Sequence, residues 1–127
     1  MGGYMVDIKR YNKKVFENIK HIDEYGNEYW KARELQQILG YKEWRYFSTV
    51  IEKAQVACLM SNNSINNDFG VYTKIVVAGV SSKTIIDYKL SRYACYLIVQ
   101  NANPKFKAVR DTIKKLDGNN AGGIYDT

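Results

Sequence analysis

Residue types that could perform catalysis are few and scattered in this chain of 127 residues. His21 is its sole histidine, and no Ser-His-Asp, Cys-His or HExxH arrangement can be recognised around it. The aspartates and glutamates form no paired motif of a nuclease, and the chain contains no glycine-rich phosphate loop. We therefore predict that the protein is not an enzyme, and that it uses no metal, no cofactor and no small-molecule substrate.

The cysteines indicate a compartment rather than a site. Cys58 and Cys95 lie far apart in apolar stretches, and two cysteines cannot form the usual structural zinc site. Nothing suggests a secreted disulfide framework, so we predict two small buried hydrophobic residues in a reducing compartment. The first residues lack the apolar run of a signal peptide, and no stretch is long enough to span a bilayer. A cytoplasmic location without membrane contact is expected.

The charge balance favours an acidic partner. Lys and Arg number 19 against 13 Asp and Glu, which gives a formal net charge of +6. Such a balance suits a polyanion or an acidic protein surface, although a scattered, well-solvated basic surface would give the same totals. Eleven tyrosines and two tryptophans add rings that suit both base stacking and protein interfaces.

A predicted helix pair supplies the first candidate interface. The spacing of apolar residues predicts one helix over residues 32–39, a glycine cap at Gly40, and a longer helix over residues 42–60. A short helix, a glycine turn and a longer helix are the parts of a helix-turn-helix, whose second helix lies in the major groove of DNA. A plain helical hairpin with a solvated face is the alternative. The predicted nucleic-acid contacts on this second helix are Lys42, Arg45, Thr49 and Lys53.

Two further basic regions are candidates for phosphate contacts. Arg92 lies in the first turn of a helix predicted over residues 92–101, where free backbone N–H groups favour anions; the alternative is an internal pair with Asp87 or Glu34. Pro104 is expected to begin a helix over residues 105–116. Its basic face would add phosphate affinity, or would be the solvated face of any charged helix. The candidates on it are Lys105, Lys107, Arg110 and Lys114.

The elements that position these residues give an α+β class: a β-hairpin, a helix-turn-helix-like helix pair, a second β-hairpin and C-terminal helices. The first hairpin is predicted over residues 19–31 and the second over strands 71–80 and 84–90, with a turn at residues 81–83. Residues 61–69 read as an exposed Asn-rich loop. We expect a basic N-terminal arm over residues 1–14, one domain over residues 15–116, and a flexible Gly/Asn tail over residues 117–127.

Several blocks of the sequence form one specific pattern. They are Phe16–His21, Glu28–Leu35, Leu39–Trp44 and Asp87–Ile98, with Phe47, Val50, Ile51, Ala54, Cys58, Gln100, Asn101 and Pro104 beside them. Taken together, these blocks resemble the DNA-damage-inducible protein D group of the BRO-N and phage antirepressor superfamily. The resemblance runs from about Phe16 to Pro104 and is far more specific than any single short motif. The loop at residues 61–69 and the region after Pro104 depart from it. Longer relatives continue into a second helical region, so the chain is either part of a longer protein or a short stand-alone relative.

The resemblance implies a non-catalytic modulator of DNA transactions in a bacterial or phage-infected cell, of the antirepressor or SOS type, that binds DNA or a DNA-binding protein. A rival hypothesis is a protein-directed inhibitor of a repressor, a recombinase or a CRISPR effector, with the loop at residues 61–69 and the tyrosines as contacts. A third is a homodimerisation module that pairs through exposed strand edges at residues 71–80.

Overall fold

The computed structural model describes residues 16–106 and 108–112. The α+β class predicted from the sequence is confirmed, with a sheet of strand order β1-β2-β4-β3 whose strand pairs are all antiparallel. The expected N-terminal arm, the C-terminal tail and the candidates Lys107 and Lys114 lie outside the described residues. In the described part of the chain, no helix combines the length and the apolar character needed to cross a membrane.

The first hairpin forms as predicted, from β1 (His21–Ile22) and β2 (Glu28–Lys31). Its reversal depends on Asp23, whose carboxylate accepts hydrogen bonds from the backbone N–H groups of Tyr25 and Asn27, both at 2.9 Å. Gly26 takes a positive φ of 84° there, a conformation that glycine adopts without steric cost. The loop is therefore built by one side chain and one permissive residue.

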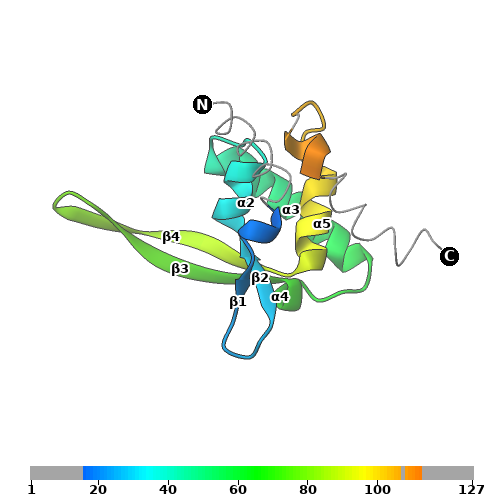
Figure 1. The fold of residues 1–127 in the computed structure, drawn as a ribbon, viewed down its shortest axis with the longest axis horizontal. Helices are drawn as coiled ribbons and strands as arrows, with labels where there is room; N and C mark the ends of the chain where they lie inside the picture. The colour runs from blue at the N-terminus through cyan, green and yellow to red at the C-terminus, as the bar shows by residue number, and fades with distance from the viewer. Residues whose placement is uncertain (1–15, 107, 113–127) are drawn as a thin grey trace, which may run out of the picture.

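The helices lie where the apolar spacing predicted them. They are α2 (Ala32–Ile38), α3 (Trp44–Met60) and α5 (Arg92–Asn101), and they gather at one end of the molecule (Figure 1). Gly40, at a φ of +87°, ends the turn that follows α2. Ser91 caps α5 as expected, because its hydroxyl accepts a hydrogen bond from the N–H of Ala94. The main helical partner of α3 is α5, whereas α2 packs chiefly on β4.

The core forms around Trp30, which is completely buried. Its ring stacks on Phe16 at 4.6 Å between centroids, and its indole N–H donates to the carbonyl of Phe16 at 2.8 Å. The predicted stripe of α3 contributes Phe47, Val50, Ile51, Ala54 and Cys58 to the same core. Cys95 is buried too, so the interpretation of both cysteines as small buried residues is confirmed.

Four boundaries differ from the sequence-based prediction. The longer helix begins at Trp44, two residues later than expected. The predicted loop contains one helical turn, α4 (Ile65–Asp68), and its last residue, Phe69, is buried as the first residue of β3. Residues 104–106 form a turn, and the helical conformation after them is described at residues 108–112.

The largest correction concerns the second hairpin. It consists of β3 (Phe69–Ala78) and β4 (Ser81–Leu90), with Ala78 opposite Ser81. The reversal is thus at Gly79 and Val80 rather than at residues 81–83, because Gly79 takes the positive φ of 63° that a tight turn needs. β2 pairs with β4 only near Leu90. Most of the hairpin therefore projects from the helices as a long arm (Figure 1).

Candidate nucleic-acid interface

The outer face of α3 carries the candidates that the helix spacing predicted. Arg45, Thr49 and Lys53 are exposed there, and the guanidinium of Arg45 lies 4.8 Å from the centre of the Tyr46 ring. The Thr49 hydroxyl donates to the carbonyl of Arg45 at 3.2 Å, which leaves its lone pairs free for a donor. Glu52 lies on the same helix surface, so the face is basic without being uniformly positive.

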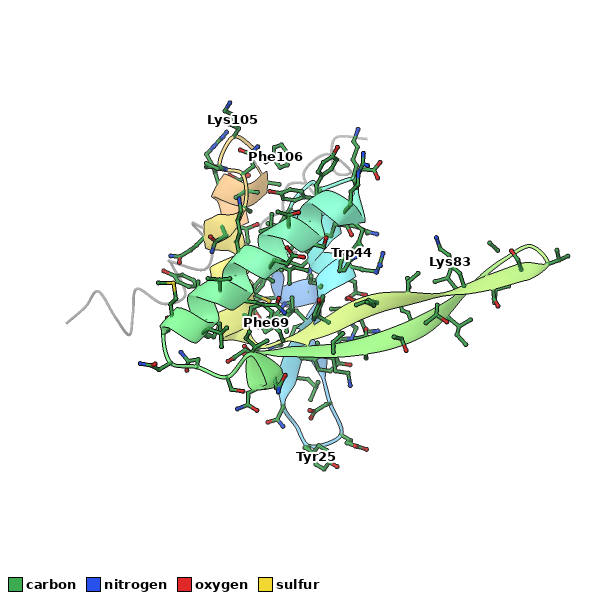
Figure 2. All side chains as sticks on the ribbon, turned by 180° about the vertical axis from the view of Figure 1, so that it is seen from behind. Tyr25, Trp44, Phe69, Lys83, Lys105 and Phe106 are labelled. Atoms are coloured by element: carbon green, nitrogen blue, oxygen red, sulfur yellow. The ribbon has the colours of Figure 1, made fainter. Side chains whose placement is uncertain are left out.

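A contact between two distant segments gathers more positive charge next to this helix. The rings of Tyr41 and Phe106 meet edge to face at 5.1 Å, and the N–H of Asn103 donates to the Tyr41 hydroxyl at 2.8 Å. Lys42 follows Tyr41 and Lys105 precedes Phe106, so both lysines lie at the same end of the molecule. Figure 2 shows this end, with Lys105 and Phe106, opposite the Tyr25 tip of the first hairpin.

Arg110 belongs to the same end. Its guanidinium donates to the carbonyls of Pro104 and Lys105, at 2.9 and 3.0 Å. These bonds fix the side chain without neutralising it, because carbonyls carry no net charge. Within the described residues, neither Lys42 nor Lys53 has an ion pair. We call the set Lys42, Arg45, Thr49, Lys53, Lys105 and Arg110 the basic face.

Arg92 does not join the basic face. Its guanidinium binds Glu28 at 2.8 and 3.1 Å and Glu17 at 3.0 and 3.4 Å, and it lies 5.0 Å from the centre of the Trp30 ring. The internal pair that was the alternative from sequence is therefore the observed one, with different carboxylates from the two expected. Hydrogen bonds to these carboxylates raise the pKa of Arg92, and those from Arg92 lower the pKa of Glu28. A guanidinium whose donors and charge are already engaged by two carboxylates has little capacity to bind a phosphate.

Arg33 and Glu34 hold elements together instead of forming a pair with one another. The Arg33 guanidinium lies 4.0 Å from the centre of the Trp44 ring and donates to the carbonyl of Ile86 at 2.8 Å. Glu34 binds the ring of His21 at 2.7 Å. Arg33 therefore joins α2 to the start of α3 and to β4, and the lone histidine joins β1 to α2.

The root of the arm is organised by a buried carboxylate, Asp87, which is fully inaccessible. Its oxygens accept from the N–H of Arg33 at 3.1 Å, from the Tyr72 hydroxyl at 3.3 Å and from Lys74 Nζ at 3.2 Å. Burial, followed by the negative charge of Asp87, raises the pKa of Tyr72 to about 12, so that the hydroxyl keeps its proton. Lys31, the N-cap residue of α2, makes no capping bond with its side chain. Asp87 on β4 provides the cap instead, since it accepts from the N–H of Arg33 in the first turn of α2.

The arm itself is a surface that sequence reasoning missed. Four aliphatic side chains point from one face of the arm. Side chains alternate along each strand, and residues that lie opposite each other across the pair share a face, as Thr73 does with Ile86 and Ile75 with Thr84. Their exposed fractions are large for aliphatic residues. We call this set the apolar arm face: Val71 at 63%, Ile75 at 71%, Val77 at 73% and Ile86 at 46%.

An alternation of apolar and polar residues could have signalled one exposed side, but residues 75–78 are all apolar and suggest a buried strand instead. At the root of the arm, the face meets the helices where Tyr88 stacks on Trp44, with 6.4 Å between the ring centres. Figure 2 shows Lys83 far out on the arm, away from Lys105. The arm and the basic face are thus separate surfaces.

No cluster of three or more His, Cys, Asp or Glu side chains that could hold a metal occurs among the residues with described positions. The fold and its surfaces define a small α+β domain with a basic helical face and a projecting β arm. The chain belongs to the BRO family as an N-terminal domain, since the model of that family matches residues 18–115. The resemblance seen in the sequence is confirmed.

A curated relative shares much of this sequence. The chain is 44% identical over 90 residues to DNA damage-inducible protein D of Escherichia coli (strain K12). The match covers 70% of this chain and 33% of that protein, so the chain spans about a third of the relative's length. No solved structure matches the chain significantly.

Proposed function

We propose that this domain is a non-catalytic modulator of DNA transactions, of the antirepressor or DNA-damage-response type, which binds DNA through its basic face. The relative's printed name refers to induction by DNA damage, and a protein that acts by stoichiometric binding needs no catalytic group. The observation that carries the proposal is the contact of Tyr41 with Phe106. Lys42 follows Tyr41 and Lys105 precedes Phe106, so this contact supports a shared positive end where α3 begins.

The chemistry of the face suits a duplex with phosphates on both sides of a groove. Lys42, Lys53 and Lys105 would grip phosphates, which gives affinity without sequence information. Arg45 lies near the start of α3, the position from which a recognition helix reaches base edges. A guanidinium there could make a bidentate contact with guanine. Lys107 and Lys114, which lie outside the described residues, are proposed as further phosphate contacts from the sequence alone.

The test is fluorescence anisotropy of labelled double- and single-stranded DNA over a series of salt concentrations. Each phosphate contact contributes about 0.9 to the slope of log affinity against log salt, so Lys42→Ala/Lys105→Ala should lower the slope by roughly 2. Arg45→Ala should weaken binding and reduce discrimination between DNA sequences. Lys53→Ala should reduce the slope by about 1.

Lys83→Ala is the matched control, because Lys83 is an exposed lysine on the arm, away from the basic face. We expect it to leave the slope unchanged. Equal losses for Lys53→Ala and Lys83→Ala would mean that binding follows net charge alone and would refute a localised basic face. Absence of binding at low salt would refute direct DNA contact altogether.

A second candidate, a protein-directed inhibitor of a repressor, recombinase or CRISPR effector, is favoured by a different surface. The last turns of α3 expose Val56 at 55%, Leu59 at 56% and Met60 at 81%, next to the exposed Asn62 and Asn63. Apolar side chains rimmed by amides are typical of protein interfaces. A Met60→Glu change should weaken such a complex and leave DNA affinity nearly unaltered. Either partner could be bound by a monomer or by a homodimer.

A further inference from the structure

The outer edge of β3 is open along the arm. β3 is the last strand in the order β1-β2-β4-β3, so no strand in the described part of the chain covers the edge that faces away from β4. Residues 71–78 contain one charged side chain, Lys74, and no proline. That lysine is directed to Asp87, with 3.2 Å between its Nζ and the carboxylate. Apart from Lys74, whose ammonium is paired with Asp87, the edge has none of the common protections against strand pairing, which are charges, prolines and bulges.

The apolar arm face gives the same strand the composition of an association-prone segment. The exposed fractions of Val71, Ile75, Val77 and Ile86 together equal about two and a half fully exposed aliphatic side chains per arm. The other residues on the apolar arm face are Thr73, Ser82 and Thr84, so this face carries no charge. Uncovered strands of this composition promote association.

We propose that the arm pairs with the arm of a second copy of this chain, edge to edge along β3, to form a continuous four-stranded ribbon. The charges favour a second copy over an acidic or nucleic-acid partner. The edge strand, whose single charge at Lys74 is paired with Asp87, meets its own copy without strong repulsion, as a two-fold symmetric interface requires, whereas DNA or an acidic protein would need unpaired cations there. This inference does not depend on DNA binding by the basic face.

Symmetry and charge disfavour a register centred on Lys74 and allow one centred on Ile75. In an antiparallel pair related by a two-fold axis, one residue of β3 lies opposite its own copy. With Lys74 at that position, two ammonium groups would face each other, which destabilises a strand pair. With Ile75 there, Lys74 lies opposite the second copy's Val76, and Thr73 lies opposite its Val77. The apolar face then continues across all four strands, and the overlap still includes residues 72–78.

A disulfide across the two-fold axis tests this register. Opposed residues in an antiparallel pair have Cα atoms about 4.5–5.5 Å apart, within the range that a disulfide spans. Ile75→Cys should therefore give a covalent dimer under mild oxidation. Thr84→Cys is the matched control, because Thr84 is exposed, pairs with Ile75 and lies on the same face. In the four-stranded ribbon its two copies would be roughly 14 Å apart, too far to bond.

Reversible association gives an independent measurement, by sedimentation velocity over a range of protein concentrations. The wild-type chain should be a dimer. Ile75→Lys should raise the dimer dissociation constant by roughly tenfold or more, since it removes an apolar contact and opposes two like charges. Thr84→Lys adds the same charge on β4 and should leave the dimer largely intact.

Three outcomes would overturn the proposal. A wild-type monomer at every concentration excludes the ribbon. Efficient cross-linking of Thr84→Cys would mean that the arms stack face to face instead of pairing by their edges. A monomer whose DNA affinity changes with Ile75→Lys would place DNA on the arm. The first two results do not bear on the basic face, and the third is distinguished from binding there by the salt slopes of the Lys42→Ala/Lys105→Ala variant.

Discussion

Replacement of Asp87 by asparagine should destabilise the domain and loosen its arm. The carboxylate is completely buried, and it accepts from Arg33 at the start of α2 and from Tyr72 and Lys74 on β3. An asparagine can keep the bond from the Arg33 N–H through its oxygen. Its NH2 group, however, would face the Tyr72 hydroxyl and the Lys74 ammonium, and an ammonium group can only donate.

The magnitude follows from what is lost at each oxygen. Hydrogen bonds to a charged acceptor contribute about 1.5–3 kcal/mol, against about 1 kcal/mol for neutral ones. The Lys74 side chain is 40% exposed, so water screens this ion pair and its share is at most about 1 kcal/mol. We expect Asp87→Asn to lower the free energy of unfolding by about 2–4 kcal/mol. For a domain of this size that corresponds to a fall in Tm of roughly 6–15 °C.

Urea and thermal unfolding followed by circular dichroism measure this change, with Asp23→Asn as control. Asp23 also accepts backbone N–H bonds, but in the first hairpin's turn, where asparagine makes the same bonds; its unfolding midpoint should hardly move. Lys74→Met should cost much less than Asp87→Asn. A wild-type midpoint for Asp87→Asn would refute the assigned role of the carboxylate. Equal losses for Lys74→Met and Asp87→Asn would assign that role to the ion pair alone.

Three further outcomes are expected. Ser91→Ala removes the N-cap of α5, and the urea midpoint should report a loss of about 1–2 kcal/mol. In the folded chain, the hydrogen bonds from Arg92 lower the pKa of Glu28 below its usual value of 4.5. The ionised carboxylate therefore stabilises the fold fully above pH 4.5, and this stabilisation is lost as the pH falls through the lowered pKa. Unfolding measured below pH 4.5 should accordingly depend less steeply on pH in an Arg92→Met variant, and an unchanged slope would contradict the pair. Burial raises the pKa of Cys95 and of Cys58, so a thiol reagent should react with neither until the chain unfolds, and rapid reaction of the native protein would contradict their burial.

The parts of the fold set by local sequence could be predicted. The spacing of Phe47, Val50 and Ile51 fixes the buried side of α3 whatever surrounds it. Ser91 and Gly40 act within their own turns, so their capping roles follow from sequence alone. The second hairpin could be predicted as two strands, but its turn was misplaced. Glycine and its neighbour form the tighter reversal, whereas the polar run after Val80 reads as a loop.

The candidate site was less predictable, because its arrangement depends on contacts between distant segments. The position of Arg92 in a helical first turn suggested an anion site, but Glu17 and Glu28, which neutralise it, lie 75 and 64 residues away in the chain. The packing of Tyr41 on Phe106 joins segments that are equally remote. The exposure of the arm could not be predicted for a different reason. An apolar strand normally indicates burial within the same chain, whereas the strands of the arm project from the body.

The two proposals together constrain how DNA would be bound. From Phe69 to the proposed axis at Ile75 is six residues, about 20 Å of strand, so the starts of the two paired β3 strands would be on the order of 40 Å apart. Dimeric helix-turn-helix proteins contact half-sites about 34–36 Å apart, one turn of the duplex. Because Trp44 stacks on Tyr88 and Arg33 bonds to the carbonyl of Ile86, α3 is tied to the arm root rather than free to adjust. A rigid ribbon of this length would therefore favour two sites on one face of DNA, and Ile75→Lys should abolish that preference while each basic face keeps its own affinity.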